Sequence, residues 1–322
     1  MENNENNSLE NIVDAMTTIA TGIPAPIQKN FWTSVGKLCT AAVDIPVAYL
    51  EGQADLRRAN TEARKLLIGN ITENMSDQIE VPEVYSIKAV ERFASKIIKQ
   101  QINLDQIVSN AANNLAHTHI SDSETVDEIS EDWLNSFEEI AKLKSSDDMR
   151  LFYGKLLSNE ISNPGSFSLK TINVVSQLDS AVASIFLKFC NASFYIPLEN
   201  KVPIAMMPVL GDGFKDYTAL GILYHEIQTL QNYGLIHSTT SGLRLSEFPD
   251  TTTTISHGKK EYYLETIELG KNPQNINPTG YFLSIAGLEI MPILDLNGNL
   301  DVLENFSEFL KSKNIKLTEK KE

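Results

Sequence analysis

The chain has 322 residues, 42% of them hydrophobic, and its 42 acidic and 27 basic side chains give a formal net charge of −15. This length and hydrophobic content are sufficient for two domains with packed cores. The negative charge is unfavourable for nonspecific binding to phosphate backbones, which depends on clustered Lys and Arg. The first twenty residues lack the basic and apolar regions of a secretory signal, and no segment is long enough for a membrane span. We therefore expect a globular cytoplasmic protein that is not a general DNA binder.

The N-terminal part is predicted to be a flexible segment over residues 1–22 followed by a domain of long helices over residues 23–116. Apolar side chains recur there at helical spacing, at Ile27, Phe31, Val35 and Leu38. Packing in a core or against a partner helix explains this pattern, because Lys37, Asp44 and Pro46 interrupt the apolar stretch. The alternative is peripheral membrane contact through residues 27–50.

Further helices are predicted before a linker. Residues 47–71 favour a helix whose charged side chains lie three or four positions apart, which is typical of a solvated face. Residues 86–115 predict one or two more helices with apolar positions at Val90, Phe93, Ile97, Ile98, Ile102, Leu104, Ile107 and Val108. Long helices of this type commonly dimerise, so we expect a helical hairpin or bundle that self-associates. The polar and acidic residues 117–129 predict a linker.

Residues 130–192 are predicted to form a compact domain of four short helices. Ser130 is the expected N-cap of the first, which carries an apolar stripe and ends near Lys144. Ser145 and Ser146, followed by two aspartates, resemble a capping box that begins the second helix.

The second helix is expected to end at the Asn163, Pro164, Gly165 turn. A third carries apolar residues at helical spacing from Leu169 to Val175, and Asp179 is the expected N-cap of the fourth.

This region also carries a family resemblance, through Trp133, Phe137, Ser145, Ser146, Gly154, Lys155, Glu160, Pro164, Gly165 and Phe167. The pattern resembles a bacterial domain-of-unknown-function family and, more distantly, the abortive-infection alpha proteins tied to phage resistance. Residues 43–52 and 62–64 extend the resemblance upstream, so that it covers most of the chain. Tyr153 stands where the family often has tryptophan, and Lys155 where arginine is usual. The resemblance implies a setting in phage defence and no catalytic residues, so the motif residues are predicted to be structural.

Residues 193–314 predict a winged-helix-like α+β module followed by a basic tail over residues 315–322. A helix with apolar residues from Leu220 to Leu230 ends at Gly234, and residues 235–245 are expected to form a hairpin. Strands are expected at residues 261–269 and 281–284, and helices beginning near Ala286 and Leu300.

Nucleic-acid binding by this module is possible but disfavoured, because no Lys or Arg lies between Thr218 and Gly234. If it did bind nucleic acid, the expected contacts are His225, Gln228, Lys259 and Lys260. Contact with other proteins is the preferred use of the module.

Catalytic interpretations find little support in the residue pattern. His117 and His119 are two residues apart without a third metal ligand nearby, and Cys39 and Cys190 lack CxxC spacing, which predicts buried thiols. The chain has no G-x-S-x-G elbow, and its Gly211 to Gly213 segment lacks the residues of a phosphate-binding loop. The carboxylate to watch is Glu160, whose charge at a helix C-terminus opposes the dipole and calls for a basic partner or a functional role.

The sequence thus predicts a mainly α protein with a smaller α+β part, formed by long N-terminal helices, a central helical motif domain and a winged-helix-like module. We expect a non-enzymatic cytoplasmic interaction protein without cofactor or metal. Its expected partners are proteins and further copies of itself, in an abortive-infection-like setting. The alternatives are a winged-helix nucleic-acid-binding regulator and a membrane-active toxic effector.

Overall fold

The structure is a computed structural model that describes residues 22–39, 83–118, 120, 125–197, 203–209, 221–238, 241–242, 254–267 and 279–320. Helices predominate and are accompanied by one antiparallel sheet, so the protein is mainly α with some β. The chain divides into two compact units, Met1–Gly165 and Ser166–Glu322. This division falls inside residues 130–192, which are predicted above as one domain. The helix expected at 47–71, the upstream family motif and the Gly211 to Gly213 turn lie outside the described residues.

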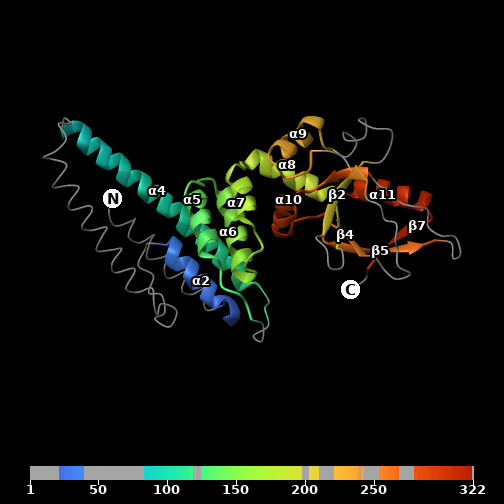
Figure 1. Ribbon diagram of the computed structural model, residues 1–322, viewed down its shortest axis with the longest axis horizontal. Coiled ribbons are helices and arrows are strands. Elements are labelled where there is room, and N and C mark those ends of the chain that lie inside the picture. The colour runs from blue at the N-terminus through green and yellow to red at the C-terminus, as the bar shows by residue number, and fades with distance from the viewer. Residues whose placement is uncertain are drawn as a thin grey trace. The chain divides into compact units, whose positions relative to one another are not determined.

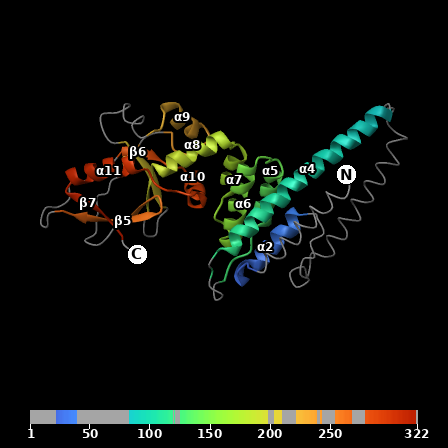
Figure 2. The same cartoon turned by 180° about the vertical axis from the view of Figure 1, so that it is seen from behind.

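The first unit consists of helices packed around one long helix. Its elements are α2 (Ala25–Leu38), α4 (Glu83–Ala116), α5 (Glu131–Ala141) and α6 (Asp147–Ser162). The segment predicted as one or two helices over 86–115 is therefore the single helix α4. Its C-terminal half supplies buried side chains such as Leu104, Ile107 and Leu115 to a core shared with the other three helices. The N-terminal end of α4 extends beyond α5 and α6, as the views from both sides show (Figures 1 and 2).

Part of the predicted linker is fixed to this core. Asn30 in α2 is buried, and its side-chain nitrogen donates to the carbonyl oxygens of Asp127 (2.8 Å) and Ile161 (3.2 Å). Its side-chain oxygen accepts from the backbone nitrogen of Ile129 at 3.1 Å. Because one amide satisfies three backbone groups, it holds the chain before α5 against α2 and α6.

In the part of the second unit that the structure describes, helices accompany a seven-stranded antiparallel sheet of order β3-β6-β2-β1-β4-β5-β7. The strands are β1 (Phe194–Ile196), β2 (Ile204–Val209), β3 (Ser241–Gly242), β4 (Thr254–His257), β5 (Lys260–Thr266), β6 (Thr279–Phe282) and β7 (Ile315–Glu319). The helices are α7 (Leu169–Ser176), α8 (Ser180–Asn191), α9 (Tyr224–Asn232), α10 (Ile285–Ile290), the 3-10 turn η2 (Met291–Ile293) and α11 (Leu300–Ser312). The central strands pair in the register Phe194↔Met206 and Met206↔Phe282. Phe306 of α11 packs on Phe194 with ring centroids 4.4 Å apart, so α11 covers this part of the sheet.

Several predicted helix starts are confirmed. Ser130 accepts from the backbone nitrogen of Trp133, and Asp179 accepts from that of Val182. The predicted capping box at Ser146 is wrong in one respect, because the Ser146 side chain makes no cap hydrogen bond although Ser146 occupies the N-cap position. Helix α6 ends at Ser162, before the predicted turn, and α11 begins at Leu300 as expected.

Two predictions for the C-terminal part need correction. Within the described residues, Ile236 and β3 pair with Leu283 and β6, so the strand after α9 finds its partner far along the chain and not in a local 235–245 hairpin. The basic tail predicted for 315–322 is strand β7 over Ile315–Glu319, paired antiparallel with β5. Ile315 is buried, which explains why this lysine-rich segment is ordered in the sheet.

Candidate interaction surface and the family motif

The aromatic residues Trp133, Phe137 and Tyr153 lie in the core of the first unit. Trp133 and Phe137 stack with centroids 4.9 Å apart, and Phe137 meets Tyr153 of α6 at 5.7 Å. All three side chains are buried, and burial raises the pKa of the Tyr153 hydroxyl. Lys144 places its ammonium group 5.3 Å from the centre of the Tyr153 ring. These contacts join α5 to α6 and give the aromatic motif positions a packing role.

Gly154 marks the point where α6 crosses α4 most closely. A Cβ atom added at Gly154 would lie 2.6 Å from the Cβ atom of Asn110 and 3.3 Å from the backbone nitrogen of Ala111. Since real Cβ atoms do not approach so closely, glycine at this position lets the two helix backbones meet. The motif glycine is therefore explained by packing.

Glu160 has a structural partner at the end of α6. Its side chain is 1% exposed, and its Oε1 accepts from the backbone nitrogen of Gly165 at 2.7 Å. Gly165 has a φ of +86°, a conformation that glycine adopts without strain. The carboxylate thus stabilises the Asn163 to Gly165 turn, which supplies an explanation that needs neither a basic side chain nor a chemical role.

The remaining motif residues divide between surface and core. Ser145 and Ser146 are exposed, Lys155 and Pro164 are half-buried, and Phe167 is buried. The structure therefore scatters the motif residues over core, turn and surface and does not gather them around a cleft.

A second buried contact cluster joins the end of α2 to α4. Gln101 donates from Nε2 to the side chain of Asp105 (2.8 Å) and to the carbonyl oxygen of Leu38 (3.0 Å). Burial raises the pKa of Asp105, and hydrogen bonds from Gln101 and the Cys39 thiol oppose that rise. Cys39 and Cys190 are buried thiols outside any disulfide, as predicted.

His257 connects three segments of the second unit from a buried position. Its Nε2 accepts from the backbone nitrogen of Asn299 (2.8 Å), and its Nδ1 lies 3.0 Å from the carbonyl oxygen of Ser193. Burial lowers the pKa of His257, so the neutral ring is favoured. The carbonyl oxygens of Ser193 and Asn299, the latter 2.9 Å from Nε2, oppose this fall in pKa. A proton on Nδ1 lets the ring donate to Ser193 and accept from the Asn299 nitrogen.

The candidate nucleic-acid contacts do not form a basic patch. His225 and Gln228 are exposed on α9, but Glu226 between them accepts from Lys188 Nζ at 2.8 Å, and this contact helps to lower the pKa of the Glu226 carboxyl against the effect of burial. Lys260 forms an ion pair with Glu319 (2.9 Å). Lys259 is exposed in the β4–β5 turn.

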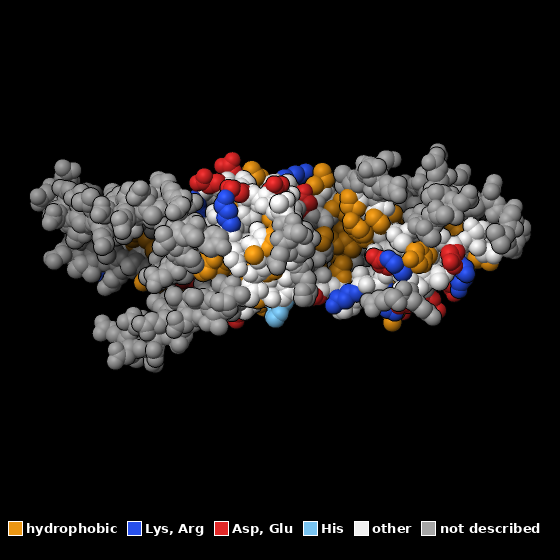
Figure 3. Space-filling view, turned by 90° about the horizontal axis from the view of Figure 1, so that it is seen from below, with side chains coloured by type: hydrophobic (Ala, Val, Ile, Leu, Met, Phe, Trp, Pro, Cys, Tyr) orange, Lys and Arg blue, Asp and Glu red, His pale blue; other side chains and the backbone are white. Residues whose placement is uncertain are grey.

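Ion pairs also link the outer strands of the sheet, at Lys316 with Glu265 and Lys320 with Glu261. Lys and Arg side chains accordingly lie beside Asp and Glu side chains on this part of the surface (Figure 3). Such mixed charge is unlike the clustered positive charge of a phosphate-binding face.

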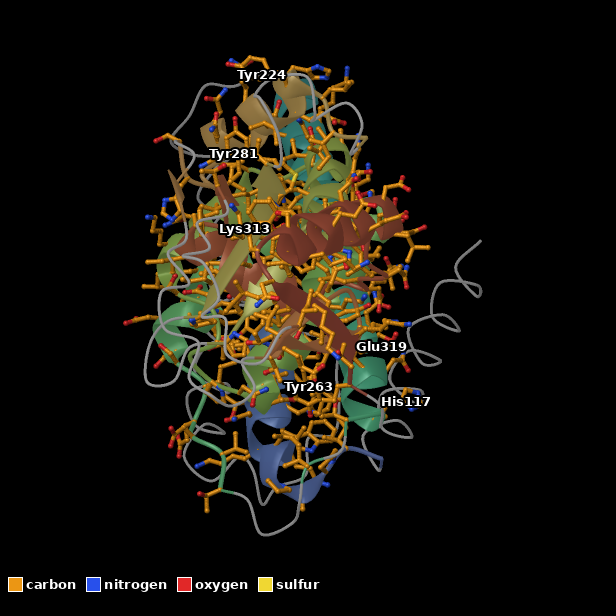
Figure 4. The ribbon with its side chains drawn as sticks, turned by 90° about the vertical axis from the view of Figure 1, so that its right-hand side faces the viewer. His117, Tyr224, Tyr263, Tyr281, Lys313 and Glu319 are labelled. Atoms are coloured by element: carbon orange, nitrogen blue, oxygen red, sulfur yellow. The ribbon has the colours of Figure 1, made fainter. Side chains whose placement is uncertain are left out.

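The residues considered for membrane contact and for metal binding do not have the positions that these functions require. The apolar side chains of α2, from Ile27 to Leu38, are buried, which agrees with the core-packing prediction; residues 40–50 lie outside the described part. His117 is exposed and points outward (Figure 4), and no group of three metal-ligating side chains occurs among the described residues. No helix of the described part is long and apolar enough to cross a bilayer.

The clearest unexplained surface is on α4. Phe93, Ile97, Ile98 and Ile102 are 65%, 46%, 58% and 40% exposed, respectively. We call residues 88–102 the exposed arm of α4. The sequence groups these four residues with Leu104 and Ile107, which are buried, and periodicity alone does not distinguish the two sets. Apolar side chains that are exposed and clustered in this way are typical of contact sites.

A polar depression of about 480 Å³ lies in the first unit, lined by Thr118, Ile120, Thr125, Val126, Asp127, Ser162, Asn163 and Pro164. It adjoins the end of the motif. Its lining offers one carboxylate and no cationic or nucleophilic group beyond hydroxyls, which is a weak basis for chemistry.

Comparison with known proteins identifies a family whose function is unknown. Residues 87–307 match the family described as "Protein of unknown function (DUF2806)", and the chain belongs to this family. No curated protein and no solved structure matches the chain.

Proposed function

We propose that the chain is a non-enzymatic interaction protein whose contact surface is the exposed arm of α4. The observation that carries this proposal is the row of exposed apolar side chains from Phe93 to Ile102 on a helix whose other half is packed in the core. Full burial of such a side chain gains about 1.5–3 kcal/mol relative to full exposure. Because these residues are 40–65% exposed, a partner that covers them gains roughly half of that for each.

The motif residues support a contact role over catalysis. Glu160 and Tyr153 are engaged in turn stabilisation and core packing, and Gly154 serves a helix crossing. The proposed setting is cytoplasmic phage defence, as the family resemblance implies, with proteins or further copies of the chain as partners.

The test is the molar mass of the full-length protein by size-exclusion chromatography with light scattering. Phe93→Ser with Ile98→Ser should remove any self-association or partner complex. Leu143→Ser with Leu151→Ser, which replaces two equally exposed residues of the same unit, should not. Equal behaviour of both variants in every complex would reject the α4 surface.

A nucleic-acid-binding winged helix is the second candidate, favoured by strand order. Helix α9 leads into Ile236 and β3, β3 pairs with β6, and β6 pairs with β2, which gives the three-strand order β2-β6-β3 after a helix. A winged helix passes from its third helix into a wing in this way. The lack of Lys and Arg in α9 weakens this candidate.

This candidate is tested by adding DNA or RNA to the same chromatography. An increase in mass that becomes smaller at higher salt and is absent in Gln228→Ala would show that α9 binds nucleic acid. An unchanged mass leaves the α4 surface as the proposed site.

A further inference from the structure

The exposed arm of α4 has a second face of opposite character. Its basic side chains, all exposed, are Lys88, Arg92, Lys96 and Lys99. At 100° per residue they fall within a sector of about 80°, while Phe93 and Ile102 limit a mainly apolar half of about 180° on the other side, in which Glu91 and Gln101 are the polar positions. A basic face on a chain of net charge −15 is a local reversal of sign.

The spacing of these charges indicates an anionic partner. Lys88, Arg92 and Lys96 follow one another at four-residue steps, where like charges face each other and destabilise a helix. Among the side chains that the structure describes, no acidic group forms an ion pair with any of the four; Glu91, three positions after Lys88, is the acidic residue of the arm and its side chain lies outside that set. A negatively charged surface removes this repulsion, whereas a second copy of the arm adds to it.

The width of the apolar face decides between anionic partners. Nucleic acid neutralises the basic residues but leaves Phe93 and Ile98 in water. A lipid surface covers a half-circumference of apolar side chains and places the basic face near the headgroups, the arrangement of helices that lie in the plane of a membrane interface. Phe93 to Ile102 spans about 14 Å along the axis, which suits a helix lying on the bilayer and not crossing it.

We propose that the exposed arm of α4 binds an anionic phospholipid surface, with Phe93, Ile97, Ile98 and Ile102 inserted at the headgroup boundary and the four basic side chains held by lipid phosphates. The inference rests on the proposed function of this arm as a contact surface and assigns it a lipid partner, while a protein partner or a second copy is an alternative outcome of the test. Basic residues near such a surface each strengthen binding several-fold. Lys88 and Lys96 form the two edges of the basic sector, about 40° from Ile102 and about 60° from Phe93, from which long side chains reach the headgroups beside an inserted helix.

The test is flotation of the full-length protein with phosphatidylcholine vesicles that contain or lack phosphatidylglycerol, at about 0.1 M salt, where charges on the rest of the molecule are screened beyond about 10 Å. The wild type should float with the anionic vesicles only. Lys88→Gln with Arg92→Gln and Lys96→Gln should weaken partition on the order of 100-fold. Phe93→Ser with Ile98→Ser should weaken it roughly tenfold or more.

Matched controls remove the same groups elsewhere. Lys170→Gln with Lys259→Gln and Lys311→Gln takes away three other exposed lysines, and Leu143→Ser with Leu151→Ser takes away two other exposed leucines. Both controls should float as the wild type does. Because all substituted side chains are exposed, every variant should keep the wild-type melting temperature.

The outcomes separate the lipid inference from the proposed function. Absence of flotation, or flotation that the arm variants leave unchanged, overturns the lipid inference. If the same arm variants then disrupt an oligomer or a nucleic-acid complex, the arm remains the contact surface with a different partner. If they disrupt nothing, both proposals are overturned.

Discussion

Glu289 and Ser168 lie 121 positions apart in the chain, yet one carboxylate oxygen of Glu289 accepts from both the backbone nitrogen (2.8 Å) and the hydroxyl (3.1 Å) of Ser168. Ser168 is the N-cap of α7, and its hydroxyl also accepts from the backbone nitrogen of Thr171. Glu289 therefore fixes the cap of α7 from α10 and places a negative charge at a helix N-terminus.

Glu289→Gln should lower the free energy of unfolding by about 1–2 kcal/mol, because a charge-assisted bond to two donors becomes a neutral one. Urea unfolding followed by circular dichroism measures this change. Glu304→Gln, which alters an exposed residue of α11, should change stability by less than about 0.5 kcal/mol. Equal effects of the two variants would show that the Ser168 contact contributes little.

Gly154→Ala tests the close crossing of α4 and α6. On an open helix face this substitution raises stability by about 0.4–1 kcal/mol, but here the new methyl group would lie 2.6 Å from the Asn110 Cβ atom. We expect a loss of about 1–3 kcal/mol in thermal or urea unfolding. Adding Asn110→Gly should recover part of this loss in a double-mutant cycle. A stabilised Gly154→Ala protein would contradict the crossing.

Trp133 tests whether the aromatic motif acts through packing alone. Its Nε1 is buried and has no hydrogen-bond partner among the described residues. Removing the indole N–H therefore breaks no hydrogen bond that stabilises the fold. Trp133→Phe should cost less than about 1.5 kcal/mol, whereas Trp133→Ala should cost about 3–5 kcal/mol. A large loss in Trp133→Phe, measured by urea unfolding, would point to a role for the N–H group.

His257 predicts a pH dependence of stability. Burial lowers its pKa in the folded state, while in the unfolded chain the value is near 6.5. The unfolded state therefore binds the proton more tightly, so stability rises with pH through this window and is lost as pH falls below about 6.5.

Urea midpoints measured on either side of about pH 6.5 check this expectation. His257→Gln should be less stable at neutral pH but should lose less stability on acidification than the wild type does. If the two proteins show the same pH slope, other groups account for it.

The sequence was a good guide where structure is local. Apolar spacing and caps at Ser130 and Asp179 predicted α5 and α8, because both signals depend on residues three or four positions apart. The pairing of Ile236 with Leu283 could not be predicted in this way, since the two strands are joined only by the tertiary fold. Strand β7 was not predicted, because its lysines resemble those of a solvated tail and its strand conformation depends on pairing with β5.

The candidate surface shows the same limit. Phe93 and Leu104 occupy equivalent positions in one apolar pattern, but Leu104 is packed in the bundle and Phe93 is exposed. A sequence records that a residue prefers burial and does not record what covers it. Sequence reasoning did not single out the basic face of the arm, because its significance depends on the exposure of the apolar face opposite.

The most direct measurement places a single reporter on the exposed arm. Cys39 and Cys190 are buried, so Ala89→Cys can be labelled selectively in the folded protein with a polarity-sensitive fluorophore one turn from Phe93. The account predicts a blue-shifted emission at Ala89→Cys with anionic vesicles and no shift for the same label at Leu143→Cys. A shift at high protein concentration without vesicles would show that the arm contacts a second copy instead. Unchanged emission at both positions under all these conditions would contradict the claim that the α4 arm is the contact surface.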